Sequence, residues 1–186
     1  MIERIMKHII LRLILLLIPL LVSSGSTQHD LTSAIIEKSN IEFSIVNAGI
    51  NVTGTIGNIV AEISLDPKHL NQSSVVAKVS AATIQTGIGI RDKHLRKSDY
   101  FHTEKYPEIV LRSKRISGGP HIFKGKFDLT IKDITREVAF SFKRTHKQDV
   151  THYHGRFNIN RLDFNLGEKS SVLDDIVTVT IDIDVK

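Results

Sequence analysis

Apolar and polar residues alternate along most of the chain from residue 41 onward. Ile41, Phe43 and Ile45, for example, alternate with Glu42 and Ser44. A period of two is typical of strands that bury one face. The pattern predicts eight or nine strands, in segments 41–45, 50–56, 59–65, 75–81, 109–114, 123–131, 138–142, 153–159 and 177–184.

Turn residues separate these segments. Asp66-Pro67 and Gly118-Gly119-Pro120 interrupt the alternation in two places. The longest exception is segment 88–101, which is charged and does not alternate, so we expect a short helical insert there. Pro107 restricts Tyr106 to extended geometry, which predicts that the next strand begins directly after the insert.

Each predicted strand has one apolar face, and the sequence contains too little helix to cover those faces. The apolar faces must therefore pack against one another. Closure of the sheet into a barrel also removes unpaired strand edges. We predict an all-β fold, an eight-stranded antiparallel barrel with a short helical insert around residues 88–101.

The predicted interior contains both small and bulky residues. Inward phenylalanines would fill it with the protein's own side chains, whereas small inward residues would leave room for a ligand. The residues alone therefore leave two functions open, a ligand-binding barrel and an extracellular β-sandwich interaction module without a ligand cavity. The small inward residues are Gly54, Ala61, Ala77, Ala81, Gly125 and Gly155.

Residues 1–26 have the three parts of a secretory signal peptide. Arg4, Lys7 and Arg12 are basic, residues 13–22 are apolar, and residues 23–26 are small. A membrane anchor, the alternative, needs about 20 consecutive apolar residues, and Arg12 makes this run shorter. We expect a signal peptide at 1–26, a polar leader at 27–39 and one β-barrel domain at 40–186, in a protein that is periplasmic or secreted.

The length of 186 residues suits a single domain. The chain has no cysteine, which excludes disulfides, thiolate metal sites and cysteine nucleophiles. The net charge is +5, and it falls to +3 without residues 1–26, which carry three basic residues and one acid. This charge is too small to indicate a nucleic-acid partner.

The insert is the densest polar segment. Asp92 or Asp99, His94 and Ser98 are residue types found in hydrolase sites, but no nucleophile-elbow pattern surrounds Ser98. We therefore expect no enzymatic activity. Two interpretations remain, a solvated insert held by salt bridges and a basic collar for an anionic head group. The collar would consist of Arg91, Lys93, Arg96, Lys97 and Lys105.

His152 and His154 form a His-x-His pair, and on a strand both rings project from one face. Such a pair can bind a metal ion. No carboxylate is evident at a matching spacing, so we expect both rings to face solvent without a ligand. We accordingly expect neither a metal nor another cofactor.

Several motifs together resemble the YceI-like family. They are Arg91-Asp92-Lys93-His94-Leu95, Asp99-Tyr100-Phe101, Lys105-Tyr106-Pro107, and segments 129–136, 157–164 and 175–185. The resemblance covers residues 41–186 and implies an exported, eight-stranded lipocalin-like barrel without enzymatic activity. It implies that an apolar tunnel binds a polyisoprenoid, such as a polyprenyl phosphate or an isoprenoid quinone, or another long-chain lipid. Such a lipid partner makes transient membrane contact an expectation.

The resemblance favours the cavity over a filled interior, so we expect a tunnel wall at twelve inward positions. These are Phe43, Ile45, Ile63, Ala77, Val79, Ala81, Leu111, Phe127, Leu129, Phe140, Phe157 and Val179. Arg91, His94 and Arg96 are the expected head-group contacts. Asn47 lies near a position where many family members have histidine, so the ligand head here can differ.

Overall fold

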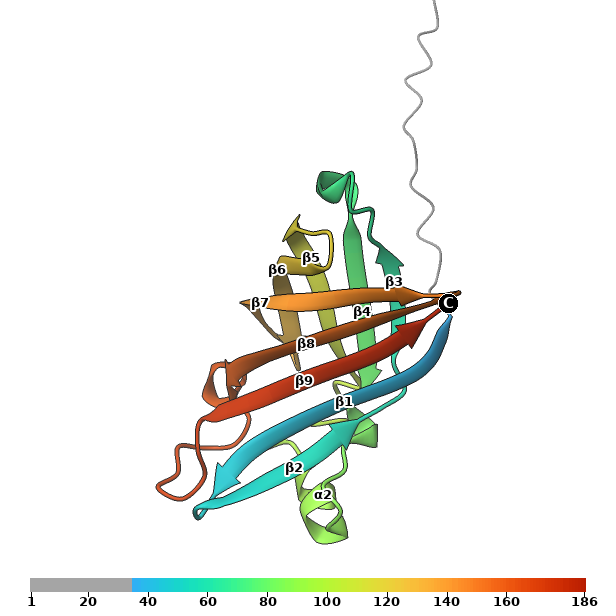
Figure 1. Cartoon of the computed structure of the whole chain (residues 1–186). Helices are drawn as coiled ribbons and strands as arrows, with labels where there is room; N and C mark the ends of the chain where they lie inside the picture. Colours follow the sequence, from blue (N-terminus) through green and yellow to red (C-terminus); the bar gives the residue numbers. More distant parts are fainter. Residues whose placement is uncertain (1–34) are drawn as a thin grey trace, which may run out of the picture. The chain divides into compact units, whose positions relative to one another are not determined.

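The structure is a computed structural model that describes residues 35–186. The predicted signal peptide and residues 27–34 of the predicted leader lie outside the described residues. Nine strands account for most of the described chain (Figure 1). They are β1 (Ile36–Asn47), β2 (Ile50–Ile56), β3 (Val60–Ser64), β4 (Ser74–Ser80), β5 (Glu108–Gly118), β6 (Ile122–Ile131), β7 (Ile134–Lys147), β8 (Val150–Asn160) and β9 (Ile176–Val185).

The strands form one curled antiparallel sheet with the order β2-β1-β9-β8-β7-β6-β5-β4-β3. The predicted all-β antiparallel fold is confirmed, but the number of strands is nine rather than eight. β2 and β3 are separate short strands at the two edges of the sheet. They are separate because Gly57 and Asn58 interrupt the chain between them, and Asn58 has a positive φ of 54°. Gln85 pairs with the β2 edge through two backbone hydrogen bonds to Thr55, of 2.8 and 3.0 Å.

β1 begins at Ile36, so the last four residues of the predicted leader belong to the sheet. Ile36 pairs with Val185 and Ser39 pairs with Ile183, both on β9. The alternation of the sequence does not mark this stretch, because residues 37–40 are exposed on both faces. Pairing with the last strand, rather than burial, therefore determines where the sheet begins.

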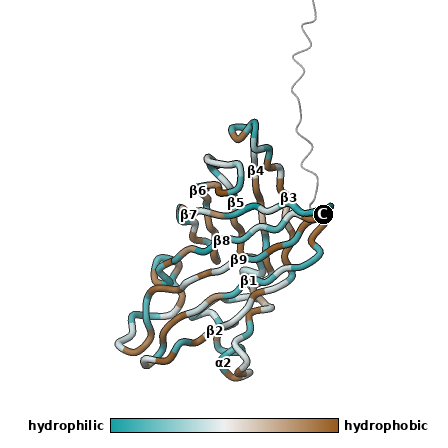
Figure 2. The backbone as a smooth tube through the Cα atoms, in the orientation of Figure 1, coloured by the Kyte–Doolittle hydropathy of each residue, from teal (hydrophilic) through white to brown (hydrophobic). Residues whose placement is uncertain are grey.

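The predicted helical insert is present as α2 (Gly89–Leu95), followed by turns. Three short 3-10 helices complete the described elements, η2 (Leu70–Gln72), η3 (Ala81–Thr83) and η4 (Arg161–Phe164). Figure 2 shows the alternation of hydrophilic and hydrophobic residues along the strands. Among residues 35–186, no helix combines the length and apolar character needed to cross a membrane.

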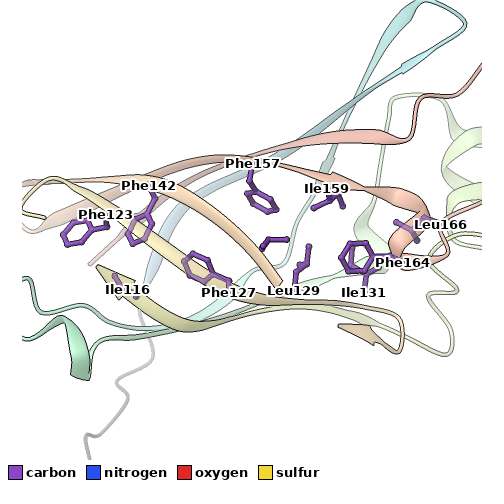
Figure 3. Close-up of a cluster of buried hydrophobic side chains, with 11 residues drawn as sticks. Ile116, Phe123, Phe127, Leu129, Ile131, Phe142, Phe157, Ile159, Phe164 and Leu166 are labelled. Atoms are coloured by element: carbon purple, nitrogen blue, oxygen red, sulfur yellow. The ribbon is translucent and has the colours of Figure 1, made fainter. Parts of the chain in front are cut away.

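Phenylalanine rings pack along the β6–β8 wall of the sheet (Figure 3). Phe127, Phe140 and Phe157 stack in series, with ring centroids 4.7 and 4.5 Å apart. Phe123 stacks on Phe142 at 5.4 Å, where β6 begins. The buried core continues along this wall from Phe123, near the β5–β6 turn, to Phe164 and Leu166 at the other end (Figure 3).

The α2 end of the sheet, as we call it, consists of α2, the β1–β2 turn and the connection from β8 to β9 (Figure 1). Backbone hydrogen bonds hold these parts together. The amide of Ala48 in the turn donates to the carbonyl oxygen of Val172 at 2.7 Å. The amide of Gly167 donates to the carbonyl oxygen of Asp99, also at 2.7 Å, in the turns after α2. The connection from β8 to β9 therefore links the β1–β2 turn with the helical insert.

Candidate functional site

A cavity of about 430 Å³ lies within the curled sheet. This volume falls within the range of small-molecule sites, roughly 300–1,000 Å³. Eleven of the twelve expected wall residues line it, and most of the other lining residues are aliphatic or aromatic too. The eleven are Phe43, Ile45, Ile63, Ala77, Val79, Leu111, Phe127, Leu129, Phe140, Phe157 and Val179.

Ala81 is the expected wall residue that does not line the cavity. β4 ends at Ser80, and Ala81 begins the 3-10 helix η3. Its backbone amide donates to the carbonyl oxygen of Pro107 at 2.8 Å, and its side chain is buried. The alternation of β4 predicts that Ala81 faces the cavity, but the strand ends one residue earlier and the side chain is buried outside the lining.

Exposure of the inward side chains distinguishes a cavity from a filled interior. Ile41, Phe43 and Ile45 on β1 line the cavity but remain only half-buried, and so do Ala77 and Val79 on β4. By contrast, the inward residues of β6 are fully buried within the aromatic core. The unfilled space therefore lies against the β1 and β4 walls, and the stacked rings of Phe127, Phe140 and Phe157 fill the opposite wall.

Gly54 and Gly125 do not create this space, contrary to the expectation from the sequence, whereas Gly155 lines the cavity. A Cβ on Gly54 would lie 2.3 Å from the ring of Phe43, and one on Gly125 would lie 2.1 Å from the ring of Phe127. Both glycines thus allow a phenyl ring to lie flat against the sheet. Ala61 and Ala77 behave differently, because they pair directly across β3 and β4 and both line the cavity.

Most of the polar residues of the lining lie near α2, and Tyr153 and His154 on the first half of β8 are the exceptions. Thr86, Arg91, His94 and Tyr100 come from the insert and its flanks, and Asn47 comes from the end of β1. The rings of His94 and Tyr100 pack edge to face, with centroids 5.1 Å apart. The cavity therefore has a long apolar body and a polar region at the α2 end.

Hydrogen bonds fix the orientation of the Arg91 guanidinium. Its Nε donates to the hydroxyl oxygen of Thr86 at 2.7 Å, and its Nη2 donates to the carbonyl oxygen of Thr86 at 3.0 Å. Asp92 accepts from the Thr86 amide at 2.8 Å and from its hydroxyl at 2.5 Å. These bonds from Thr86 hold the pKa of Asp92 below its ordinary value, so the carboxylate stays charged. Thr86 therefore holds both Arg91 and Asp92 in place.

Arg96 does not line the cavity. Its Nε donates to the carbonyl oxygen of Ala82 and its Nη2 donates to that of Ile84, both at 2.8 Å. The expected head-group contact is therefore a structural anchor of the insert in this structure. Arg91 and His94 do line the cavity.

Arg161 lines the cavity, although its position in the sequence does not predict this. This arginine is 2% exposed and begins η4 at the end of β8. It donates to the carbonyl oxygens of Asp174 and Leu166 at 2.8 and 2.9 Å, and it pairs with Asp175 at 3.1 Å. Arg161 therefore fixes the connection from β8 to β9 at the α2 end. Its place within the family-like segment 157–164 was the available signal.

The lining includes the basic residues Arg91, His94, His154 and Arg161, and among the described residues no aspartate or glutamate lines the cavity. Two of the four have carboxylate partners, since His154 pairs with Asp182 and Arg161 pairs with Asp175. Burial raises the pKa of the Tyr153 phenol, so this lining residue stays neutral. The arrangement can accept an apolar chain whose polar end is anionic or accepts hydrogen bonds.

His152 and His154 have carboxylate partners that the sequence spacing did not reveal. His152 Nδ1 lies 2.6 Å from an Asp184 oxygen, and His154 Nδ1 lies 2.8 Å from an Asp182 oxygen. The register of β8 against β9 places these pairs opposite each other. Within residues 35–186, no group of three or more histidine or acidic side chains is arranged to hold a metal ion.

Comparison with known proteins gives the same fold. The structure of BcnA from Burkholderia cenocepacia aligns with a TM-score of 0.75 at 20% identity, over 80% of this chain and 96% of that one. A polyisoprenoid-binding domain from Saccharophagus degradans, implicated in plant cell wall breakdown, aligns with a TM-score of 0.68 at 12% identity, over 83% and 97% of the two chains.

Sequence comparison identifies relatives and a family. A UPF0312 protein from Photorhabdus laumondii is 32% identical over 104 residues, which are 54% of this chain and 53% of that protein. The match thus spans about half the length of this relative. The family model of the YceI-like domain matches residues 34–185, nearly the whole region that the structure describes. The chain therefore belongs to the YceI-like domain family.

Proposed function

We propose that this is an exported lipid-binding protein that holds a long polyisoprenoid in its cavity, of the polyprenyl phosphate or isoprenoid quinone type. One observation carries the proposal: the lining is apolar along its body, has no carboxylate among the described residues, and has Arg91 and His94 at the α2 end. The YceI-like family and the fold shared with a polyisoprenoid-binding domain support this class of ligand.

The apolar body supplies most of the affinity. Each buried methylene contributes about 0.8 kcal/mol, so a prenyl chain of several units gains more than about 10 kcal/mol in total. Ordering the chain and immobilising the ligand offset much of this gain. We therefore expect a Kd in the micromolar range or tighter. The half-buried residues of β1 and β4 are the surfaces that such a chain would cover.

The polar end of the ligand belongs at Arg91. Charge-assisted hydrogen bonds from a guanidinium favour phosphate oxygens, and the two bonds to Thr86 hold this guanidinium in place before the ligand arrives. A quinone carbonyl can accept the same donors. A cationic head would find no counter-charge in the described lining.

The insert does not have the geometry of a hydrolase site, which supports a carrier rather than an enzyme. The Ser98 hydroxyl donates to Asp99 at 3.3 Å, whereas the His94 ring packs against Tyr100. The residue types that suggested catalysis thus have other partners. An interaction module without a cavity, the second function considered from the sequence, is disfavoured by the 430 Å³ of space within the sheet.

Titration with two matched lipids tests the proposal, a fluorescent polyprenyl phosphate and the corresponding polyprenol. Arg91→Gln should weaken phosphate binding at least about tenfold and leave polyprenol binding nearly unchanged. Lys93→Gln is the control, because it removes the same charge from an exposed position on the same helix. Equal losses in both variants would show that the head group does not lie at Arg91, and no binding of either lipid by the parent protein would refute the function.

A further inference from the structure

Exposed aliphatic side chains gather at the α2 end. Within residues 35–186, nine large hydrophobic side chains are strongly exposed, and three of them lie elsewhere: Ile35, Val60 and Ile122. The other six flank α2, the β1–β2 turn and the connection from β8 to β9 (Figure 1). They are Val46, Ile50, Ile88, Ile90, Val172 and Ile176.

The most exposed of the six are at the tips. Ile90 in α2 is 81% exposed, and Ile50 at the start of β2 is 69% exposed. Val172 lies beside the β1–β2 turn, because the Ala48 amide donates to its carbonyl oxygen and the Asp174 amide donates to that of Val46. Val46 pairs with Asn51 and Ile50 pairs with Asn47, so Val46 and Ile50 are exposed on opposite faces of this hairpin. Aliphatic side chains that are clustered and exposed mark a surface that another apolar phase covers.

The charge of the insert indicates what kind of apolar partner covers this surface. Lys93 follows Ile90 by one helical turn and is exposed on the same side, whereas Asp92 is buried and held by Thr86. Lys97, in the turn after the helix, is exposed as well. Segment 88–105 contains five basic and three acidic residues, which is a net charge of +2, whereas the β8–β9 connection at 161–175 contains two basic and four acidic residues. The basic surplus of this end therefore lies on the insert, around Ile90. Exposed apolar tips next to lysines are complementary to the surface of an anionic bilayer.

We propose that the α2 end is a membrane-docking surface, with Ile90 and Ile50 as the inserting side chains and Lys93 and Lys97 beside anionic lipid head groups. The proposal rests on the proposed function in one respect, because a polyisoprenoid is a membrane lipid. Docking would bring the polar end of the cavity, with Arg91 and His94, to the bilayer surface. Loading and release would then occur at the face that holds the ligand head.

Co-sedimentation with phosphatidylcholine vesicles, with and without 30 mol% phosphatidylglycerol, tests docking on protein recovered from its host. Ile90→Asp should lower the fraction bound to the anionic vesicles at least fivefold. Ile122→Asp is the matched control, because Ile122 is 61% exposed and lies at the start of β6, near the opposite end of the sheet. Both variants add one negative charge and keep the same N-terminus, so only the location of the substitution differs.

Equal binding by the parent and Ile90→Asp proteins, or equal losses in the two variants, would overturn the proposal. A dimer of the parent protein in sedimentation velocity that Ile90→Asp dissociates would also overturn it, because a second copy would then cover this face. Titration with a water-soluble short-chain polyprenyl phosphate keeps the two proposals separate. If Ile90→Asp binds the short-chain lipid as the parent does but no longer binds vesicles, the result supports docking. If the parent protein binds vesicles but no polyprenyl lipid, the proposed ligand is refuted and the docking surface stands.

Discussion

Filling the cavity from one wall should abolish ligand binding without damaging the fold. Ala77 is the position of choice, because it lies on β4 between Ala61 of β3 and Leu111 of β5, and all three side chains line the cavity. Ala77 is only half-buried although its side chain points inward. We predict that Ala77→Trp places an indole in the space that the prenyl chain would occupy.

The structure sets the size of the effect. An indole displaces at least one isoprene unit, whose five carbons contribute about 4 kcal/mol at roughly 0.8 kcal/mol each. The ligand can recover part of this by shifting along the cavity, so we expect a loss of at least about 1.4 kcal/mol, which is a tenfold increase in Kd. A filled core would resist the added volume at about 1–3 kcal/mol, but a cavity of about 430 Å³ can accept it.

Thermal unfolding and titration with a fluorescent polyprenyl phosphate, on the same samples, measure both effects. Lys78→Trp is the control, because Lys78 is the next residue on β4 and lies on the outer face, where it pairs with Glu108 at 3.5 Å. It should leave the affinity unchanged. A large drop in Tm for Ala77→Trp, with no lipid binding by the parent protein, would show that the interior is filled by its own side chains and has no room for a ligand.

Two further predictions concern stability. Gly125→Ala should lower the free energy of unfolding by about 1–3 kcal/mol, because the added Cβ would lie 2.1 Å from the Phe127 ring. Gly49→Ala in the exposed β1–β2 turn is the control, because a Cβ there meets no neighbour and only the positive φ of 76° causes strain. An equal loss of stability for both variants in chemical denaturation would show that the contact with Phe127 does not matter. Asp92→Asn should destabilise the protein at pH 7, because the bonds from Thr86 hold the folded-state pKa of Asp92 below its unfolded value. That stabilisation is present above the unfolded pKa and disappears as pH falls through the folded-state pKa, so the difference between parent and variant should shrink below about pH 4; a difference that stays constant between pH 7 and pH 3 would show that the charge of Asp92 plays no part.

The strands were predictable from the sequence because their period of two reflects a single buried face. β1 illustrates the limit, since Ile41, Phe43 and Ile45 mark the buried half of the strand but residues 37–40 give no such signal. The C-terminal strand β9 pairs with that exposed half. Such pairing depends on a partner about 140 residues away, which local alternation does not encode.

The cavity was less predictable than its wall. In a sequence, an inward glycine and an inward alanine both predict space for a ligand. Gly54 and Gly125, however, lie under the phenyl rings of Phe43 and Phe127. Ala61 and Ala77 face the space itself. The difference depends on side-chain rotamers of neighbouring residues, which a pattern of residue types does not determine.

The polar groups of the site show the same limit. Arg91 and Arg96 lie on one short insert, yet Arg91 lines the cavity while Arg96 binds the carbonyl oxygens of Ala82 and Ile84. Similarly, His154 meets Asp182 only because β8 and β9 are adjacent. Spacing along the sequence identified the residue types, and the register of the sheet decided their partners.

Native mass spectrometry of the protein purified from its own host can show whether the cavity holds a polyisoprenoid. We predict a complex with one lipid per chain, whose fragments differ by whole isoprene units and whose head is a phosphate or a quinone. Release of the lipid should give the mass of the protein alone. A phospholipid or fatty acid in the complex, or protein that carries no lipid and also binds no added polyprenyl phosphate, would contradict the account.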